Sequence, residues 1–104
     1  MEHSPYIRKR ITVENTSGRS LTFVLEPWAE EYPMPSGQRY VVEGDGPAEG
    51  AEFYVEQGDE YFVVWAWDGS DARVLREDGS VLADWTELRV PNFRELDRKR
   101  AEDV

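Results

Sequence analysis

The chain contains no cysteine and a single histidine, His3, among its 104 residues. Without cysteine it has no disulfide, no thiolate nucleophile and no sulfur ligand for zinc. One histidine close to the N-terminus leaves no Ser-His-Asp triad and little scope for acid–base catalysis by imidazole. These absences favour a protein that is not an enzyme, and they give no reason to expect a metal or a cofactor.

Long apolar runs are also missing. No segment approaches the roughly 20 consecutive apolar residues of a membrane-spanning helix, and residues 1–10 lack the apolar stretch of a signal peptide. We therefore expect a cytoplasmic protein that does not bind membranes. The length of 104 residues predicts one domain, residues 1–104.

Positive charge is scarce in the body of the chain. The formal net charge is −10, and residues 11–88 contain 4 basic and 17 acidic side chains. A nucleic-acid-binding protein needs a basic face, so this distribution argues against DNA or RNA as a partner. It suits a basic protein partner, although an acidic surface also simply keeps a small protein soluble.

The dominant pattern that is present is an alternation of apolar and polar residues, which predicts strands. Turn-forming residues separate seven such segments, at about 7–14, 21–26, 39–43, 51–56, 60–68, 72–77 and 81–85. Short strands at regular spacing predict an all-β, antiparallel seven-stranded sandwich of the immunoglobulin-like type, or a small barrel, over residues 6–85. Parallel pairing is not expected, because helical crossovers have no room here.

The C-terminal segment has a different character. Residues 91–103 predict a short helix or a tail, in which Asn92 and Glu95 have the spacing of a capping box. Phe93 and Leu96 would share one face of that helix. A helix this short is not stable alone in water, so we expect it to dock on the sandwich, bind a partner or fray.

The first candidate site is the connector at residues 26–37, which contains Trp28, Glu30, Glu31 and Tyr32. Large aromatic side chains in a connector either plug the end of a core or contact a ligand. Carboxylates beside aromatic rings are also found in glycoside hydrolases, but nothing in the chain supplies a matched catalytic pair. Glu30 and Glu31 are otherwise expected to form a solvated loop edge.

The second candidate site is the segment 60–68, which is apolar on both faces. Tyr61, Trp65 and Trp67 form one row with Val63, and the intervening residues form the other. One row must lie in the core. The second row is either covered by the C-terminal helix or the N-terminal strand, or it is exposed as a binding patch for a partner, a second copy or a sugar.

Several of these residues also carry a resemblance. The segments 11–17 and 21–25, Glu26-Pro27-Trp28, Tyr32 and Pro35-Ser36-Gly37 resemble small, uncharacterised bacterial β-sandwich proteins with the same frame. The similarity extends over residues 11–85 and is shared in part with immunoglobulin-like domains, where it marks turns and strand starts. It implies a β-sandwich and a bacterial source, and it implies no activity.

Two functional hypotheses follow. The first is a non-enzymatic, acidic protein-interaction module, of an inhibitor or immunity type or self-associating. The alternative is a saccharide-binding module that uses Trp28, Tyr32 and one of Trp65, Trp67 and Trp85.

Overall fold

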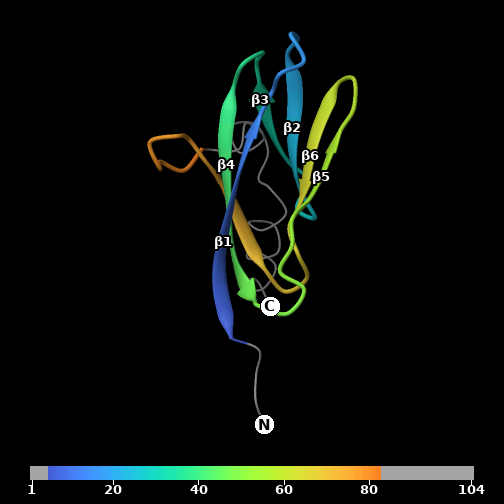
Figure 1. Cartoon of the computed structure of the whole chain (residues 1–104). Helices are drawn as coiled ribbons and strands as arrows, with labels where there is room; N and C mark the ends of the chain where they lie inside the picture. The colour runs from blue at the N-terminus through green and yellow to red at the C-terminus, as the bar shows by residue number, and fades with distance from the viewer. Residues whose placement is uncertain (1–4, 83–104) are drawn as a thin grey trace, which may run out of the picture.

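A computed structural model describes residues 5–82, which form seven strands in two sheets (Figure 1). The strands are β1 (Tyr6–Glu14), β2 (Leu21–Glu26), β3 (Glu30–Met34), β4 (Arg39–Pro47), β5 (Tyr54–Gln57), β6 (Tyr61–Trp65) and β7 (Asp71–Leu75). One sheet has the order β1-β4-β7 and the other the order β3-β2-β6-β5. The prediction of an all-β sandwich is confirmed, and neither sheet closes into a barrel.

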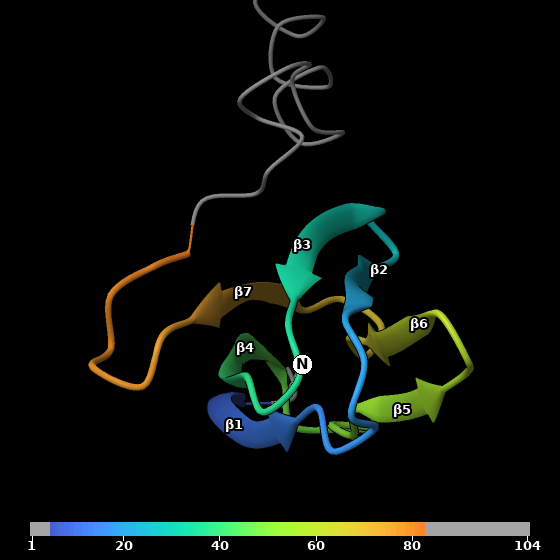
Figure 2. The same ribbon diagram turned by 90° about the horizontal axis from the view of Figure 1, so that it is seen from above.

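The two sheets pack face to face around a single apolar core (Figure 2). Phe23 lies at its centre, where its ring is 5.7–6.0 Å from the rings of Tyr32, Tyr40 and Phe62. In β2 the burial alternates strictly, as the period of a strand requires when one face is covered. Residues from both sheets therefore interdigitate in one layer of side chains.

One strand pair differs from the expected topology. Four of the five strand pairs are antiparallel, but β2 and β6 run parallel, with Phe23 opposite Phe62. The expectation of purely antiparallel pairing is therefore wrong for this pair. The chain passes from β2 to β6 through β3, β4 and β5, so the parallel pair forms without the helical crossover that a simple β-α-β unit would need.

The segment expected to be an irregular connector contains a strand instead. The chain turns sharply at Pro27–Ala29, after a cis peptide bond at Pro27, and returns along β2 as β3. Its three prolines suggest a loop, but β3 is an edge strand, where Pro33 is tolerated because its missing N–H would face away from the sheet.

Strand β4 extends beyond the predicted segment 39–43, to Pro47. Residues up to Pro47 pair with β1 in continuous register. Gly44 and Gly46 direct no side chain into the core, and the Trp67 ring occupies this space: a Cβ on Gly44 would lie 2.8 Å from it. Glycine is therefore required at these two positions because a side chain there would collide with Trp67 or with Ser70 beside it.

The end of the predicted sandwich is only partly described. Val81 forms an isolated bridge to Leu75 in place of the start of a strand at 81–85. Residues 83–85 and the predicted helix at 91–103 lie outside the described residues. Within residues 5–82 there is no helix long and apolar enough to cross a membrane.

Candidate functional site

The β2–β3 hairpin positions the first group of predicted site residues. Trp28 lies half-buried in the turn and packs against the core, as the plug alternative predicts. Glu30 and Tyr32 are buried, and the Tyr32 hydroxyl donates a hydrogen bond of 2.9 Å to Glu30 Oε1. Strand alternation places Glu31 on the opposite face. The expectation that Glu30 and Glu31 form a solvated loop edge is therefore wrong for Glu30.

The second group of predicted site residues belongs to the segment 60–68, and strand β6 divides that segment between the core and the outer face of its sheet. Phe62 and Val64 are buried in the core, whereas Tyr61 and Trp65 are 50% and 40% exposed on the outer face. The strand ends at Trp65, so Trp67 does not continue the outer row.

Trp67 belongs to the architecture of the molecule. It is 6% exposed, its ring meets that of Phe53 edge-on at 5.2 Å, and its indole N–H donates a 2.8 Å hydrogen bond to the Pro47 carbonyl. The predicted row of Tyr61, Trp65 and Trp67 is therefore wrong in its last member. The chain bends after β6 and turns Trp67 inward over the glycines of β4.

The outer side of the four-stranded sheet gathers the exposed aromatic residues, and we call it the aromatic face. Tyr54 is 61% exposed and lies directly opposite Trp65 on the neighbouring strand. Strand register places Val24 beside Val63, between the aromatic residues. The face comprises Thr22, Val24, Glu26, Glu31, Pro33, Tyr54, Glu56, Tyr61, Val63 and Trp65.

The charge of the aromatic face is entirely negative. Its four strands contain no lysine or arginine. Glu26 lies opposite Trp65, Glu56 opposite Val63, and Glu31 opposite Val24. Carboxylates thus flank the apolar centre on both sides, so the face combines large aromatic surfaces with a potential that attracts cations.

Sequence reasoning found part of this face. Glu31, Tyr61 and Trp65 were predicted and do share it, but Tyr54 and Glu56 were not singled out. The signal for them was the turn at Gly58-Asp59, which closes a hairpin in which Gln57 pairs with Phe62. Counting back from that turn puts Tyr54 opposite Trp65.

The opposite sheet carries the positive charge in a cluster of three arginines and two carboxylates, which we call the arginine cluster. Arg73 donates to Glu43 Oε1 and to Asp45 Oδ2, each at 2.6 Å. Arg10 donates to Glu43 Oε2 at 2.6 Å, and Arg8 to Asp45 Oδ1 at 2.8 Å. The alternation in the sequence predicts that Arg8 and Arg10 share one face of their strand. Their partners, Asp45 and Glu43, belong to another strand, so the sequence pattern does not reveal these ion pairs.

These contacts stabilise the ionised carboxylates. The hydrogen bond from Arg73 is the main reason why the pKa of Glu43 lies below its usual value, and Glu43 is only 5% exposed. The hydrogen bond from Arg8 likewise lowers the pKa of Asp45 and raises the pKa of Arg8. The cluster therefore stays charged at neutral pH and ties the three strands of this sheet together.

Metal binding has no assembled site in the described part of the chain. Among residues 5–82, no three His or carboxylate side chains lie close enough together to hold a metal ion. The carboxylates of the aromatic face are distributed along the strands around its apolar centre.

Comparison with known proteins assigns no family. No protein-family model, no curated protein and no solved structure matches this chain. The resemblance to small bacterial β-sandwich proteins stays a prediction, and functional inference rests on the chemistry of the two faces.

Proposed function

We propose that this protein is a non-enzymatic interaction module that binds a basic surface of another protein through the aromatic face. The observation that carries the proposal is the exposure of Tyr54, Tyr61 and Trp65 on strands that contain carboxylates and no cation. We further propose that its sandwich is of the immunoglobulin-like class and that it acts in the bacterial cytoplasm.

The aromatic residues suit the centre of an interface. Tyrosine and tryptophan bury a large area and lose only two side-chain torsions on binding, and they are the residue types most often found as hot spots. Tyr61 and Trp65 project from a strand whose other face is anchored in the core by Phe62 and Val64. Their backbones are therefore fixed before a partner arrives, which lowers the entropic cost of association.

The carboxylates favour a basic partner over a neutral one. A lysine or arginine side chain that lies over the ring of Trp65 gains a cation–π interaction, and it also reaches Glu26, which pairs with Trp65 across the strands. Long-range attraction by an acidic face also raises the rate of association. An inhibitor or immunity-type protein that covers a basic active site would use both effects, and we propose this as the role.

A photo-crosslinking experiment in the source cells tests this proposal. The photoreactive amino acid p-benzoylphenylalanine is placed at position 61, and in a second strain at position 6, because Tyr6 is equally an exposed tyrosine but belongs to the other sheet. We expect an adduct from position 61 alone, with a partner peptide rich in lysine or arginine. No adduct at position 61, equal adducts at both positions, or an adduct only with a second copy of the chain would overturn the proposal.

A saccharide ligand is the second candidate. It is favoured by the opposed and exposed rings of Tyr54 and Trp65, which offer flat surfaces for stacking of sugar rings. Tyr32 cannot take part as the sequence suggested, because it is buried. Calorimetric titration with a panel of oligosaccharides distinguishes the two: saturable binding that Trp65→Ala abolishes would replace the protein partner by a sugar.

A further inference from the structure

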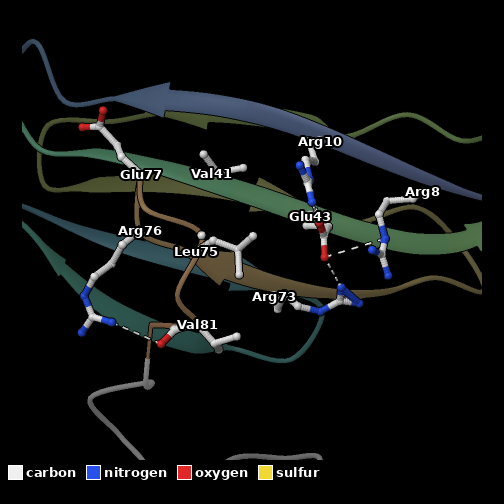
Figure 3. Close-up of a pocket in the computed structure, with 10 residues that line it drawn as sticks. Arg8, Arg10, Val41, Glu43, Arg73, Leu75, Arg76, Glu77 and Val81 are labelled. Carbon is white, nitrogen blue, oxygen red and sulfur yellow. Dashed lines mark hydrogen bonds and ion pairs between the residues drawn. The ribbon is translucent and has the colours of Figure 1, made fainter.

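The outer face of the β1-β4-β7 sheet contains a pocket of about 260 Å³ beside the arginine cluster (Figure 3). Val41, Leu75 and Val81 supply its apolar surface, and Arg8, Arg10 and Arg73 lie together at one end (Figure 3). Arg76, Glu77, Gly79 and Val81 of the loop that follows β7 also line the pocket, and this loop projects away from both layers of the sandwich (Figures 1 and 2).

Charge in this pocket is opposite in sign to the charge of the whole molecule. Its lining includes four arginines and two carboxylates, Glu43 and Glu77, in a chain whose formal net charge is −10. Asp45 neutralises one further charge of the arginine cluster, and Asp78 attracts Arg76 electrostatically from the loop that follows β7.

Arg76 supplies the least neutralised charge in the pocket. Its guanidinium donates to Ser80 Oγ and to the Val81 carbonyl, at 3.3 and 3.2 Å, and among residues 5–82 it forms no ion pair; Asp78 acts on it only by longer-range attraction. The backbone of Arg76 is fixed within the loop, because its N–H donates to the Ser80 carbonyl and its carbonyl accepts a hydrogen bond from the Gly79 N–H.

The arginine cluster adds donors that are already oriented. A guanidinium has five N–H donors, and Arg10 directs Nε and Nη2 at Glu43 while its side chain remains 60% exposed. Glu43 thus fixes the position of Arg10 and leaves part of its fork available. A site with fixed donors loses little entropy when an anion binds.

We propose that this pocket binds a small organic carboxylate with a short apolar body. The fork of Arg76 matches the planar geometry of a carboxylate, the Val41, Leu75 and Val81 side chains contact the apolar part, and the arginine cluster at the other end of the pocket adds to the attraction of an anion (Figure 3). The volume of about 260 Å³ admits a small molecule and not a folded partner. This site lies on the opposite sheet from the aromatic face, so it does not depend on the proposed function.

Titration of the full chain with sodium hexanoate, followed by amide chemical shifts, tests the proposal. We expect saturable shifts at Val41, Leu75 and Arg76 with a dissociation constant on the order of 1 mM, which is typical for a ligand of about eight heavy atoms. Hexanamide, which has the same shape without the charge, should cause no saturable shift. Inorganic phosphate tests whether charge alone suffices, and we expect it to bind at least about tenfold more weakly.

Two arginine variants complete the test. Arg76→Gln should weaken hexanoate binding about tenfold, because it removes a charged donor without leaving a carboxylate unpaired. The matched control is Arg19→Gln, which changes an exposed arginine in the β1–β2 turn outside the pocket. An absence of saturable shifts, equal affinity for hexanamide or phosphate, or the same affinity in Arg76→Gln and Arg19→Gln would each refute the proposal. Dispersed amide spectra confirm that both variants fold.

Discussion

The packing of Trp67 over the glycines of β4 gives a stability prediction that the geometry specifies closely. A Cβ added at Gly46 would lie 2.7 Å from Ser70 Cα, 2.8 Å from Ser70 Cβ and 3.1 Å from Trp67 Nε1. The nearest obstacle is backbone, so it cannot rotate away. Overpacking of this kind costs about 2 kcal/mol, which lowers the melting temperature of a domain of this size by about 8–16 °C.

The matched control is Gly58→Ala, where the nearest atom to the new Cβ is the Tyr61 carbonyl oxygen at 3.8 Å, an ordinary contact. Both variants restrict the unfolded chain equally, so the difference between them isolates the clash. Urea unfolding followed by tryptophan fluorescence measures that difference. If Gly46→Ala lies within about 0.5 kcal/mol of Gly58→Ala, the turn from Trp67 to Ser70 does not pack against β4 as described.

Three further predictions concern the core and the two buried polar residues that join strands. Asn15→Ala removes the donor to the Arg19 and Met34 carbonyls and should destabilise the protein by about 2–3 kcal/mol in urea unfolding, whereas Thr16→Ala should have little effect. Phe23→Ala should cost about 4 kcal/mol in the same assay, far more than Trp65→Ala, because Phe23 is fully buried. The ion pairs of Glu43 stabilise the fold above the unfolded carboxyl pKa of about 4 and lose this effect as pH falls through its lowered folded pKa. Glu43→Gln should therefore give a shallower fall in melting temperature between about pH 5 and 2.5, and an unchanged slope would contradict the role of the arginine cluster.

Most of the strands were predictable because turn-forming residues bound short segments in which apolar and polar residues alternate. The first two strands match the predicted segments closely, and in β2 the buried residues Leu21, Phe23 and Leu25 stand out at every second position. The structure has seven strands, as predicted, but they are not the same seven: β3 was not predicted, and the predicted segment 81–85 contributes only the bridge at Val81. Strand β3 was missed, because its core face begins with a buried glutamate, Glu30, and its outer face contains Pro33.

The limits of sequence reasoning are clearest for the site. Alternation alone placed Trp65 and Trp67 on one face, because it assumes that the strand continues. The strand ends at Trp65 because Trp67 finds a hydrogen-bond acceptor and space over glycine in the other sheet, and both depend on contacts distant in the sequence. The arginine cluster was equally hidden, since Glu43 and Arg73 become neighbours only when β4 pairs with β7.

The central claim is that the aromatic face binds a basic surface, and one calorimetric measurement tests it most directly. The affinity of the protein that crosslinks to position 61 is measured for the wild type, Trp65→Ala and Tyr6→Ala at 50 and 300 mM NaCl. Loss of a central aromatic residue should weaken binding about 30-fold, Tyr6→Ala should leave it unchanged, and added salt should weaken it further. An affinity that is insensitive to salt, or equal in Trp65→Ala and Tyr6→Ala, would contradict the account.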